Sequence, residues 1–397
     1  MSKAFLVLED STIFEGHSIG VKGQTIGEVV FTTGMTGYVE TLTDPSYYGQ
    51  IVTQTFPLIG NYGVMQKDFE SSKSWVRGYI VRELCDQPSN FRSEESLDSF
   101  LKAQNIVGIC GIDTRALTKK LRESGVMNGM IVSDEVQTSP EILKKIHDYK
   151  IERAVESVSI KDTCHAELVS ASHIEKIPKQ VRNDIFNVIL WDFGAKANIQ
   201  RELEKRGCKV TVVPYNTTAK EVLKIAPDGI MLSNGPGDPA ENTKVIDEIR
   251  KICEYDREIL KQVQDDDHIN CHAELVSASI PIFGICLGHQ MLALARGCKT
   301  SKLKYGHRGG NHPCKDTSTG RVYITSQNHG YAVETDSLPS YAIQSFTNVN
   351  DNTCEGITYT DIPAFSVQFH PEACGGPHDT NFLFDRFLEM MEVNHAS

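Results

Sequence analysis

The sequence predicts two domains, an N-terminal α+β domain followed by an α/β domain with a doubly wound, mainly parallel sheet. The chain has 397 residues, of which 40% are hydrophobic, and this length exceeds what a single core needs. Short β-rich runs and turns fill the first part, whereas strands and helices alternate from Asn187 onward. We therefore expect a first domain at residues 1–150, a linker with an inserted repeat at 151–186 and a second domain at 187–397.

The first domain combines strand-like runs with one helical stretch. Strands are expected at Ala4–Leu8, Glu28–Thr32, Gln50–Gln54 and Ser74–Arg82, and a helix is expected at Ser96–Gln104. The first run is interpreted as an edge strand, and it lacks the longer apolar core of a signal peptide. These elements predict an α+β domain without a clear βαβ rhythm.

The second domain shows the alternation that is typical of a parallel sheet covered by helices. Strand runs at Asn187–Trp191, Lys209–Val213 and Gly229–Ser233 alternate with helical runs at Lys196–Arg206 and Ala219–Ile225. Ligands of such sheets bind beyond the carboxyl ends of the strands. The segments that follow the strands are therefore where functional residues are expected.

Composition excludes several classes of function. With 40 basic and 52 acidic residues the formal net charge is -12, which argues against a nucleic-acid partner. The eleven cysteines are scattered without CxxC pairs, which disfavours a disulfide framework and a structural zinc site. No apolar run approaches the roughly 20 residues of a membrane span. A cytoplasmic protein without a metal site or a membrane segment is expected.

The sequence also contains an exact internal repeat. Nine residues at Cys164–Ser172 recur identically at Cys271–Ser279, and Lys179–Asp184 resembles part of Ile259–Asp266. One hypothesis is that two copies of a palindromic DNA element were inserted in opposite orientations and translated in place. The alternative, a structural repeat, is disfavoured because only two distant copies exist. The repeated cysteines and histidines are therefore not expected to be ligands.

Both copies lie where a fold can accept an insertion. The first copy falls in the linker, and the second insertion, at about residues 257–279, lies between a helix and the strand that starts at Ile280. A connection that enters the start of a strand lies at the edge of the sheet opposite the ligand crevice. We therefore expect the chemistry to survive both insertions.

The sharpest catalytic signal is Cys286, which lies between an apolar strand and a helical run. Gly284 and Gly288 lie two residues on either side of it, as in a nucleophile elbow, where a tight turn leaves room only for glycine. The helix N-terminus favours a thiolate, and the backbone N–H of Leu287 would point at a tetrahedral oxyanion. The alternative is a buried structural cysteine, against which the two glycines and the strand argue.

A nucleophilic thiol needs a base, and His370 follows another strand. His370 would abstract the proton of Cys286 and protonate the leaving group, while Glu372 would orient the imidazole. A single histidine after a strand is as often a structural residue as a catalytic one. It is the combination of His370 and Glu372 with the cysteine elbow that is specific.

A glycine-rich segment at Leu232–Pro239 follows a third strand. Gly235 and Gly237 would let backbone N–H groups approach a ligand and complete an oxyanion hole. An ordinary strand-to-helix turn explains the segment equally well when it is considered alone.

Taken together, Ser233–Pro239, Gly284–Gln290 and His370–Glu372 resemble the class I (triad) glutamine amidotransferases, in the same order along the chain. Other segments resemble the carbamoyl phosphate synthetase branch of that family: Lys304–Pro313, Gln327–Tyr331, Gly376–Asp379, Gly27–Tyr38, Thr43–Tyr47, Gly60–Gly63, Ser89–Arg92 and Gly111–Arg115. Other amidotransferases lack the first domain, so its segments carry most of the discrimination. The resemblance covers nearly the whole chain except the linker and the insertions.

The resemblance implies a site and a reaction. Cys286, His370 and Glu372 would be the triad that hydrolyses glutamine to glutamate and ammonia. Glutamine would be held by Ser46, Gly235, Gly237, Leu287, Gln290, Asn328, Gly330 and Tyr331. The family more often has phenylalanine at position 331, a mild difference because the implied contact is mainly through the backbone. No cofactor and no metal are expected on this chain.

The resemblance also implies a partner. A large subunit would receive the ammonia through an internal tunnel and use ATP and Mg to make carbamoyl phosphate from bicarbonate, for pyrimidine and arginine biosynthesis. The present chain shows no glycine-rich P-loop, and assembly of several heterodimers is left open. The alternatives are an amidotransferase subunit of another synthetase, a catalytically inactive regulatory or binding subunit, and a Cys-His-Glu hydrolase acting on peptides.

Overall fold

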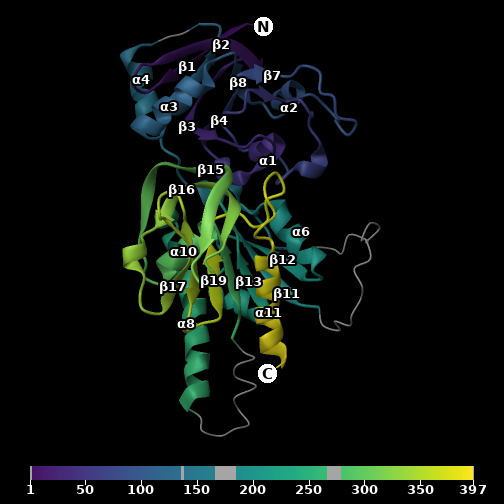
Figure 1. The fold of residues 1–397 in the computed structure, drawn as a ribbon, viewed down its shortest axis with the longest axis vertical. Helices are drawn as coiled ribbons and strands as arrows, with labels where there is room; N and C mark the ends of the chain where they lie inside the picture. The colour runs from purple at the N-terminus through teal and green to yellow at the C-terminus, as the bar shows by residue number, and fades with distance from the viewer. Residues whose placement is uncertain (1, 136–137, 166–184, 266–278, 397) are drawn as a thin grey trace.

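The computed structural model describes residues 2–135, 138–165, 185–265 and 279–396. The N-terminal part and the C-terminal part each form their own layered unit, and they meet across one interface (Figure 1). The repeat copies lie almost entirely outside the described residues. Only Cys164 and His165 of the first copy, which form the short strand β10, and Ser279 of the second copy are described.

The N-terminal unit is a closed barrel with strand order β1-β2-β8-β6-β4-β3-β9. Its strands are β1 (Lys3–Leu8), β2 (Ile13–Gly20), β3 (Gln24–Thr32), β4 (Gln50–Gln54), β6 (Gly78–Ile80), β8 (Val107–Cys110) and β9 (Met127–Ser133). Its helices are α1 (Tyr38–Thr43), α2 (Leu97–Ala103), α3 (Thr114–Ser124) and α4 (Pro140–His147), and a small sheet pairs β5 (Leu58–Ile59) with β7 (Glu83–Leu84). Helix α5 (Ala154–Val158) follows them and packs Val155 into the core of the C-terminal unit.

Three local predictions for this unit are confirmed and two are corrected. Strands β3 and β4 and helix α2, which Ser96 caps by accepting from the Ser99 N–H, lie where they were expected. The first strand is not an edge strand, because β1 pairs with β2 on one side and with β9 on the other. Of the run at 74–82, only the residues of β6 are a strand.

In the C-terminal unit, ten strands of the described chain form one sheet, ordered β10-β12-β11-β13-β14-β19-β18-β16-β15-β17. The parallel part contains β11 (Asn187–Asp192), β12 (Lys209–Pro214), β13 (Gly229–Leu232), β14 (Ile282–Ile285) and β19 (Ala364–Val367). The antiparallel extension contains β15 (Thr300–Asp316), β16 (Val322–Val333), β17 (Ala342–Asn348) and β18 (Cys354–Tyr359), and β10 (Cys164–His165) pairs antiparallel with β12.

Helices cover both faces of this sheet, as a doubly wound fold requires. Val188 and Leu190 of β11 pack with α6 (Ala197–Lys205) and α11 (Phe382–Ala396), whereas Ile189 and Trp191 pack with the helices of the other face. Those helices are α7 (Ala219–Lys224), α8 (Thr243–Asp265) and α10 (Leu287–Ala295). The alternation along β11 follows from the period of two in a strand. The predicted parallel sheet is confirmed.

Helix α8 runs through the expected start of the second insertion, at about residue 257. The helix does not end near residue 257 but continues to Asp265, and it extends away from the barrel at the far end of the C-terminal unit (Figure 1). The chain returns from this end at Ile280, just before β14. The expected place of the insertion, at the amino ends of the strands, agrees with this path.

The buried carboxyl group of Asp256 contacts the chain where it re-enters the sheet at Ile280. Asp256 of α8 is fully buried, and its Oδ1 accepts a hydrogen bond from the Ile280 N–H at 3.1 Å. Its Oδ2 has no hydrogen-bond partner among the residues the structure describes. Burial raises the pKa of Asp256 to about 7, and the bond from Ile280 only partly opposes this effect.

We predict that Asp256→Asn is more stable than the wild type at pH 8 and gains little at pH 4. The unfolded Asp256 ionises near its ordinary pKa of 3.8, whereas the folded carboxyl group holds its proton up to about pH 7. Stability is therefore lost as the pH rises through this window, by about 2 to 4 kcal/mol. Asparagine keeps an oxygen for the Ile280 N–H and cannot ionise.

Thermal or urea unfolding at the two pH values checks this prediction. Asp247→Asn is the matched control on the same helix, because the Asp247 side chain is more than half exposed. An Asp256→Asn variant whose stability change is the same at pH 4 and pH 8 contradicts the prediction.

Candidate active site

Cys286 lies on a strained turn between β14 and α10. Its φ of 54° and ψ of -102° are rare for a residue with a side chain, and such strain is typical of functional positions. A Cβ on Gly288 would lie 2.3 Å from the Leu232 carbonyl oxygen, and one on Gly284 would lie 3.0 Å from the Gly288 carbonyl group. Both glycines are therefore required by close packing, which is the reason the sequence pattern was informative.

The thiol of Cys286 is buried beside the imidazole of His370. Its Sγ lies 3.7 Å from the Asn328 carbonyl oxygen. Among the described residues, His370 Nε2 has no hydrogen-bond partner. The Cys286 sulfur is nevertheless close enough to help raise the pKa of His370. The structure therefore brings the expected nucleophile and base together.

Glu372 holds the other side of the imidazole ring. Its Oε1 lies 2.8 Å from His370 Nδ1, and both side chains are buried. Burial and the Lys196 charge lower the pKa of His370, but Glu372 and Cys286 outweigh them, so the pKa is raised. Burial raises the pKa of Glu372, but His370 and Lys196 outweigh it, so the pKa is lowered. This arrangement favours an imidazolium beside a carboxylate.

A buried lysine completes this charge cluster, and the sequence analysis did not identify it. Lys196 Nζ lies 3.3 Å from Glu372 Oε1 and 3.6 Å from Asp44 Oδ2, and its pKa is raised because Asp44, Glu372 and Glu70 outweigh burial. Lys196 follows β11 at the carboxyl edge of the sheet, where functional residues are expected. That position was the signal available in the sequence.

Residues of the barrel reach into the same centre. Ser46 Oγ accepts a hydrogen bond from Asn234 Nδ2 at 2.9 Å, and Asp44 Oδ2 accepts one from Asn328 Nδ2 at 3.1 Å. Asp44 also caps the short helix at Pro45–Tyr47 by accepting from the Ser46 N–H. The two parts of the chain therefore build one site rather than two neighbouring sites.

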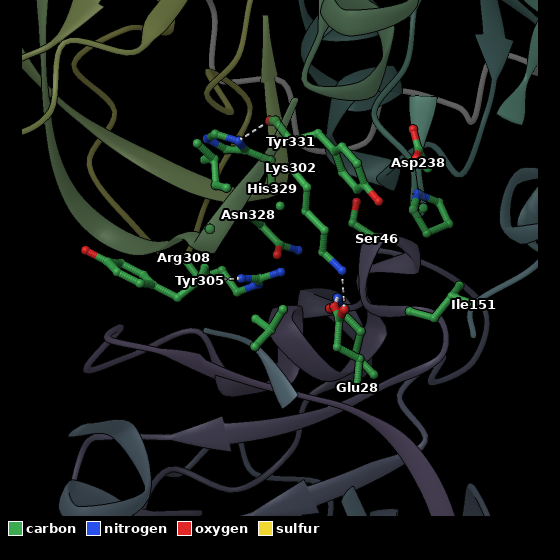
Figure 2. Close-up of a pocket in the computed structure, with 18 of the residues that line it drawn as sticks. Glu28, Ser46, Ile151, Asp238, Lys302, Tyr305, Arg308, Asn328, His329 and Tyr331 are labelled. Carbon is green, nitrogen blue, oxygen red and sulfur yellow. Dashed lines mark hydrogen bonds and ion pairs between the residues drawn. The ribbon is translucent and has the colours of Figure 1, made fainter. Parts of the chain in front are cut away.

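A cavity of about 310 Å³ opens over Cys286 between the barrel and the sheet (Figure 2). It is lined by Cys286 and by seven of the eight residues expected to hold glutamine, namely Ser46, Gly235, Gly237, Gln290, Asn328, Gly330 and Tyr331. The eighth, Leu287, packs its side chain into the hydrophobic core. Only its backbone can face the cavity. Gln290 Nε2 donates a hydrogen bond to the Tyr331 carbonyl oxygen at 2.7 Å, and this bond fixes the backbone of Tyr331.

Leu287 and Gly235, whose backbone N–H groups are expected to form an oxyanion hole, pack against each other. Leu287 is the first residue of α10, and the first N–H groups of a helix have no intrahelical acceptor. Gly235 packs against Leu287, since a Cβ on Gly235 would lie 2.8 Å from Leu287 Cδ2 and 2.2 Å from the Phe193 carbonyl oxygen. A side chain at 235 would collide with the Phe193 backbone and with the Leu287 side chain.

Among the described residues, one group of side chains is close enough to share a metal ion, namely His307, His329 and Glu355. His307 Nε2 lies 2.7 Å from Asp351 and its Nδ1 lies 3.4 Å from Glu355. Burial lowers the pKa of His307, but these two carboxylates outweigh it and raise the pKa to about 9. A proton on His307 therefore already supplies the positive charge in this cluster.

Comparisons with known proteins agree across both parts of the chain. Residues 6–131 match the family model "Carbamoyl-phosphate synthase small chain, CPSase domain", and residues 189–390 match "Glutamine amidotransferase class-I". No helix among the described residues is both long and apolar enough to cross a membrane.

Curated relatives match over nearly the whole chain. The carbamoyl phosphate synthase small chain of Listeria monocytogenes serotype 4b is 48% identical over 98% of this chain and 97% of its own length. That of Fusobacterium nucleatum subsp. nucleatum is 48% identical over 98% of both chains. That of Bacillus thuringiensis subsp. konkukian is 48% identical over 98% of this chain and 96% of its own length.

We predict that Lys196→Met lowers the free energy of unfolding by about 3 to 5 kcal/mol, because it leaves buried carboxylates without their cation. The loss should shrink as the pH falls from 8 to 5, since burial raises the pKa of the neighbouring Glu70, which then takes up a proton. Urea unfolding across this pH range is the measurement.

Lys302→Met is the matched control. Lys302 Nζ also bonds a carboxylate of the barrel, Glu28, at 2.9 Å, but its side chain is half exposed. Lys302→Met should therefore lower the free energy of unfolding by only about 0 to 1 kcal/mol. Equal losses of unfolding free energy for the two variants would mean that burial of the Lys196 cluster contributes nothing to stability.

Proposed function

This chain belongs to the family of carbamoyl phosphate synthase small chains, and from that membership we propose that it hydrolyses glutamine with Cys286, His370 and Glu372 as its triad. The chain is a glutamine amidotransferase component of carbamoyl phosphate synthase. The observation that carries the proposed triad is the strained Cys286 turn beside a buried imidazole, which is itself bonded to a carboxylate at 2.8 Å. A structural cysteine needs neither the strain nor the paired base.

The proposed reaction begins when His370 Nε2 takes the proton of the Cys286 thiol. The thiolate attacks the side-chain amide carbon of glutamine, and the N–H groups of Leu287 and Gly235 stabilise the resulting oxyanion. His370 then gives its proton to the leaving nitrogen, so that ammonia departs and a glutamyl thioester remains. Water, deprotonated by His370, attacks the thioester and releases glutamate and the free thiol.

Glu372 and Lys196 act on the imidazole rather than on the substrate. Glu372 accepts from Nδ1 and leaves Nε2 as the atom that exchanges protons with Cys286. The positive charge of Lys196 balances the negative charge of Glu372. It also keeps the pKa of His370 lower than Glu372 and Cys286 alone would set it. The proposed role of this pair is to keep the ring oriented and able both to accept and to release a proton.

The proposal extends to a partner chain. The name of the family implies a large chain, which would bind ATP and Mg and use the ammonia to make carbamoyl phosphate. Supporting this, a second cavity of about 90 Å³ reaches His370 from the interface of the two parts, lined by Thr36, Glu40 and Gly375 among others. Ammonia released at His370 would enter this cavity rather than the one that holds glutamine.

The test compares variants of the complete complex with its large chain. Cys286→Ala should lower glutamine-dependent carbamoyl phosphate synthesis roughly 10³-fold or more, because no thioester can form. Synthesis from added ammonia should remain. Cys298→Ala is the matched control, since Cys298 is also buried and burial raises its pKa to about 11, which leaves a poor nucleophile.

Two results would overturn the proposal. One is an appreciable rate of glutamine hydrolysis that is equal in Cys286→Ala and the wild type, which would mean that another group is the nucleophile. The other is a rate that is equally negligible in both, which would favour a catalytically inactive binding subunit.

A further inference from the structure

The wall of the cavity over Cys286 contains a buried guanidinium group, that of Arg308. The residue lies on β15, is only 4% exposed and lines the cavity. Figure 2 shows its nitrogen atoms pointing toward the middle of the cavity, next to Asn328. The residue lies in the segment Lys304–Pro313 that resembles the family, but no role was predicted for it, and the proposed triad does not use it.

Local backbone geometry places the guanidinium there. Pairing between β15 and β16 shifts register between Lys302 and His307, and Arg308 Nη1 donates to the Tyr305 carbonyl oxygen inside this irregular segment at 2.7 Å. A Cβ on Gly306 would lie 2.5 Å from Nη1, so the glycine at 306 makes room for the group. The side chain is thus held in one direction.

Arg308 lacks an anionic partner among the residues the structure describes. No carboxylate forms an ion pair with it within 4.0 Å, and its Nε has no hydrogen bond. The nearby carboxylate of Glu28 is already bonded by Lys302 Nζ at 2.9 Å and by Gln50 Nε2 at 2.9 Å. Burial lowers the pKa of Arg308, yet an arginine stays charged. A buried cation of this kind requires an anion to offset its desolvation.

The Nη2 end of the guanidinium lies beside Gly330, one of the residues expected to hold glutamine. A Cβ on Gly330 would lie 3.5 Å from Arg308 Nη2, and Gly330 lines the same cavity as Cys286. Cys286 and Arg308 are also close enough for the cysteine to affect the pKa of Arg308. In glutamine, two methylene groups and the α-carbon separate the amide carbon from the α-carboxylate. An amide group at Cys286 therefore leaves the carboxylate to be bound farther along the wall.

The opposite wall carries the complementary charge. Asp238 lines the cavity across from Arg308 (Figure 2), and Glu241 lines it as well. Lys302 and Glu28 also line the cavity, but they form an ion pair with each other at 2.9 Å. A guanidinium without an ion-pair partner among the described residues, with a carboxylate across the cavity, suits a zwitterionic α-amino acid better than a neutral amide. Arg308 presents two parallel N–H groups of the kind that bind a carboxylate in two places.

We propose that Arg308 binds the α-carboxylate of glutamine and so selects free glutamine over amides that lack this charge. The inference rests on the proposed glutaminase function and adds a specificity-determining residue to it. If Arg308 only braced the irregular segment of β15 through Tyr305, its loss would affect every substrate equally.

The test varies the residue and the substrate together in the complete complex. Glutaminase activity of wild type, Arg308→Gln and Arg308→Lys is measured with glutamine, with its neutral α-amide (L-glutaminamide), and with glutaramate, which keeps the carboxylate and lacks the α-amino group. Arg308→Gln should lower kcat/KM for glutamine and glutaramate by about 10- to 100-fold, mainly through KM. The α-amide should lose less than 3-fold, and Arg308→Lys should lie between.

The ratio between substrates does not depend on how much of a variant is folded, so partial misfolding cannot imitate the result. Equal losses for all three substrates, or no loss for glutamine, would overturn the proposal. Calorimetric binding of glutamine and of the α-amide, measured with and without Arg308→Gln in a Cys286→Ala background, repeats the comparison without turnover. Failure of the triad proposal would thus appear in the activity of the wild type, and failure of the Arg308 proposal in the binding ratio.

Discussion

The buried ammonium group of Lys196 joins the two parts of the chain at the candidate active site. It lies within 3.6 Å of Asp44 from the barrel and within 3.3 Å of Glu372, which holds His370. Charges that are removed from water must compensate one another closely. The orientation of the imidazole and the docking of the barrel therefore depend on the same contact, and neither can shift without exposing the other to an unbalanced charge.

The order of the sheet explains why the remaining groups meet at this point. Strands β13, β14 and β19 are neighbours and parallel, so the segments that follow them emerge side by side at one edge. These segments carry Gly235, Cys286 and His370. The strained turn at Cys286 is held by close backbone packing of Gly288 on Leu232. Each strand thus supplies one group, and the packing between strands sets their spacing.

Features with a local cause could be predicted from the sequence. The alternating strands and helices from Asn187 and the glycines around Cys286 reflect local sterics, and both predictions agree with the structure. The barrel was not recognised, because its closure depends on β1 pairing with β9 more than a hundred residues away. Asp44, Lys196 and Arg308 were missed for the same reason, since their significance comes from contacts between distant segments. Ser46 was found only through resemblance to a family.

Because Asp44 and Ser46 of the barrel lie inside the centre built by the sheet, the amidotransferase part is incomplete when taken alone. The sheet and its helices have their own hydrophobic core, but the candidate active site also needs residues of the barrel. Recombination at the connection between the halves would pair a barrel with a foreign set of charges. The two halves are therefore expected to be inherited together, with compensating changes on both sides of their boundary.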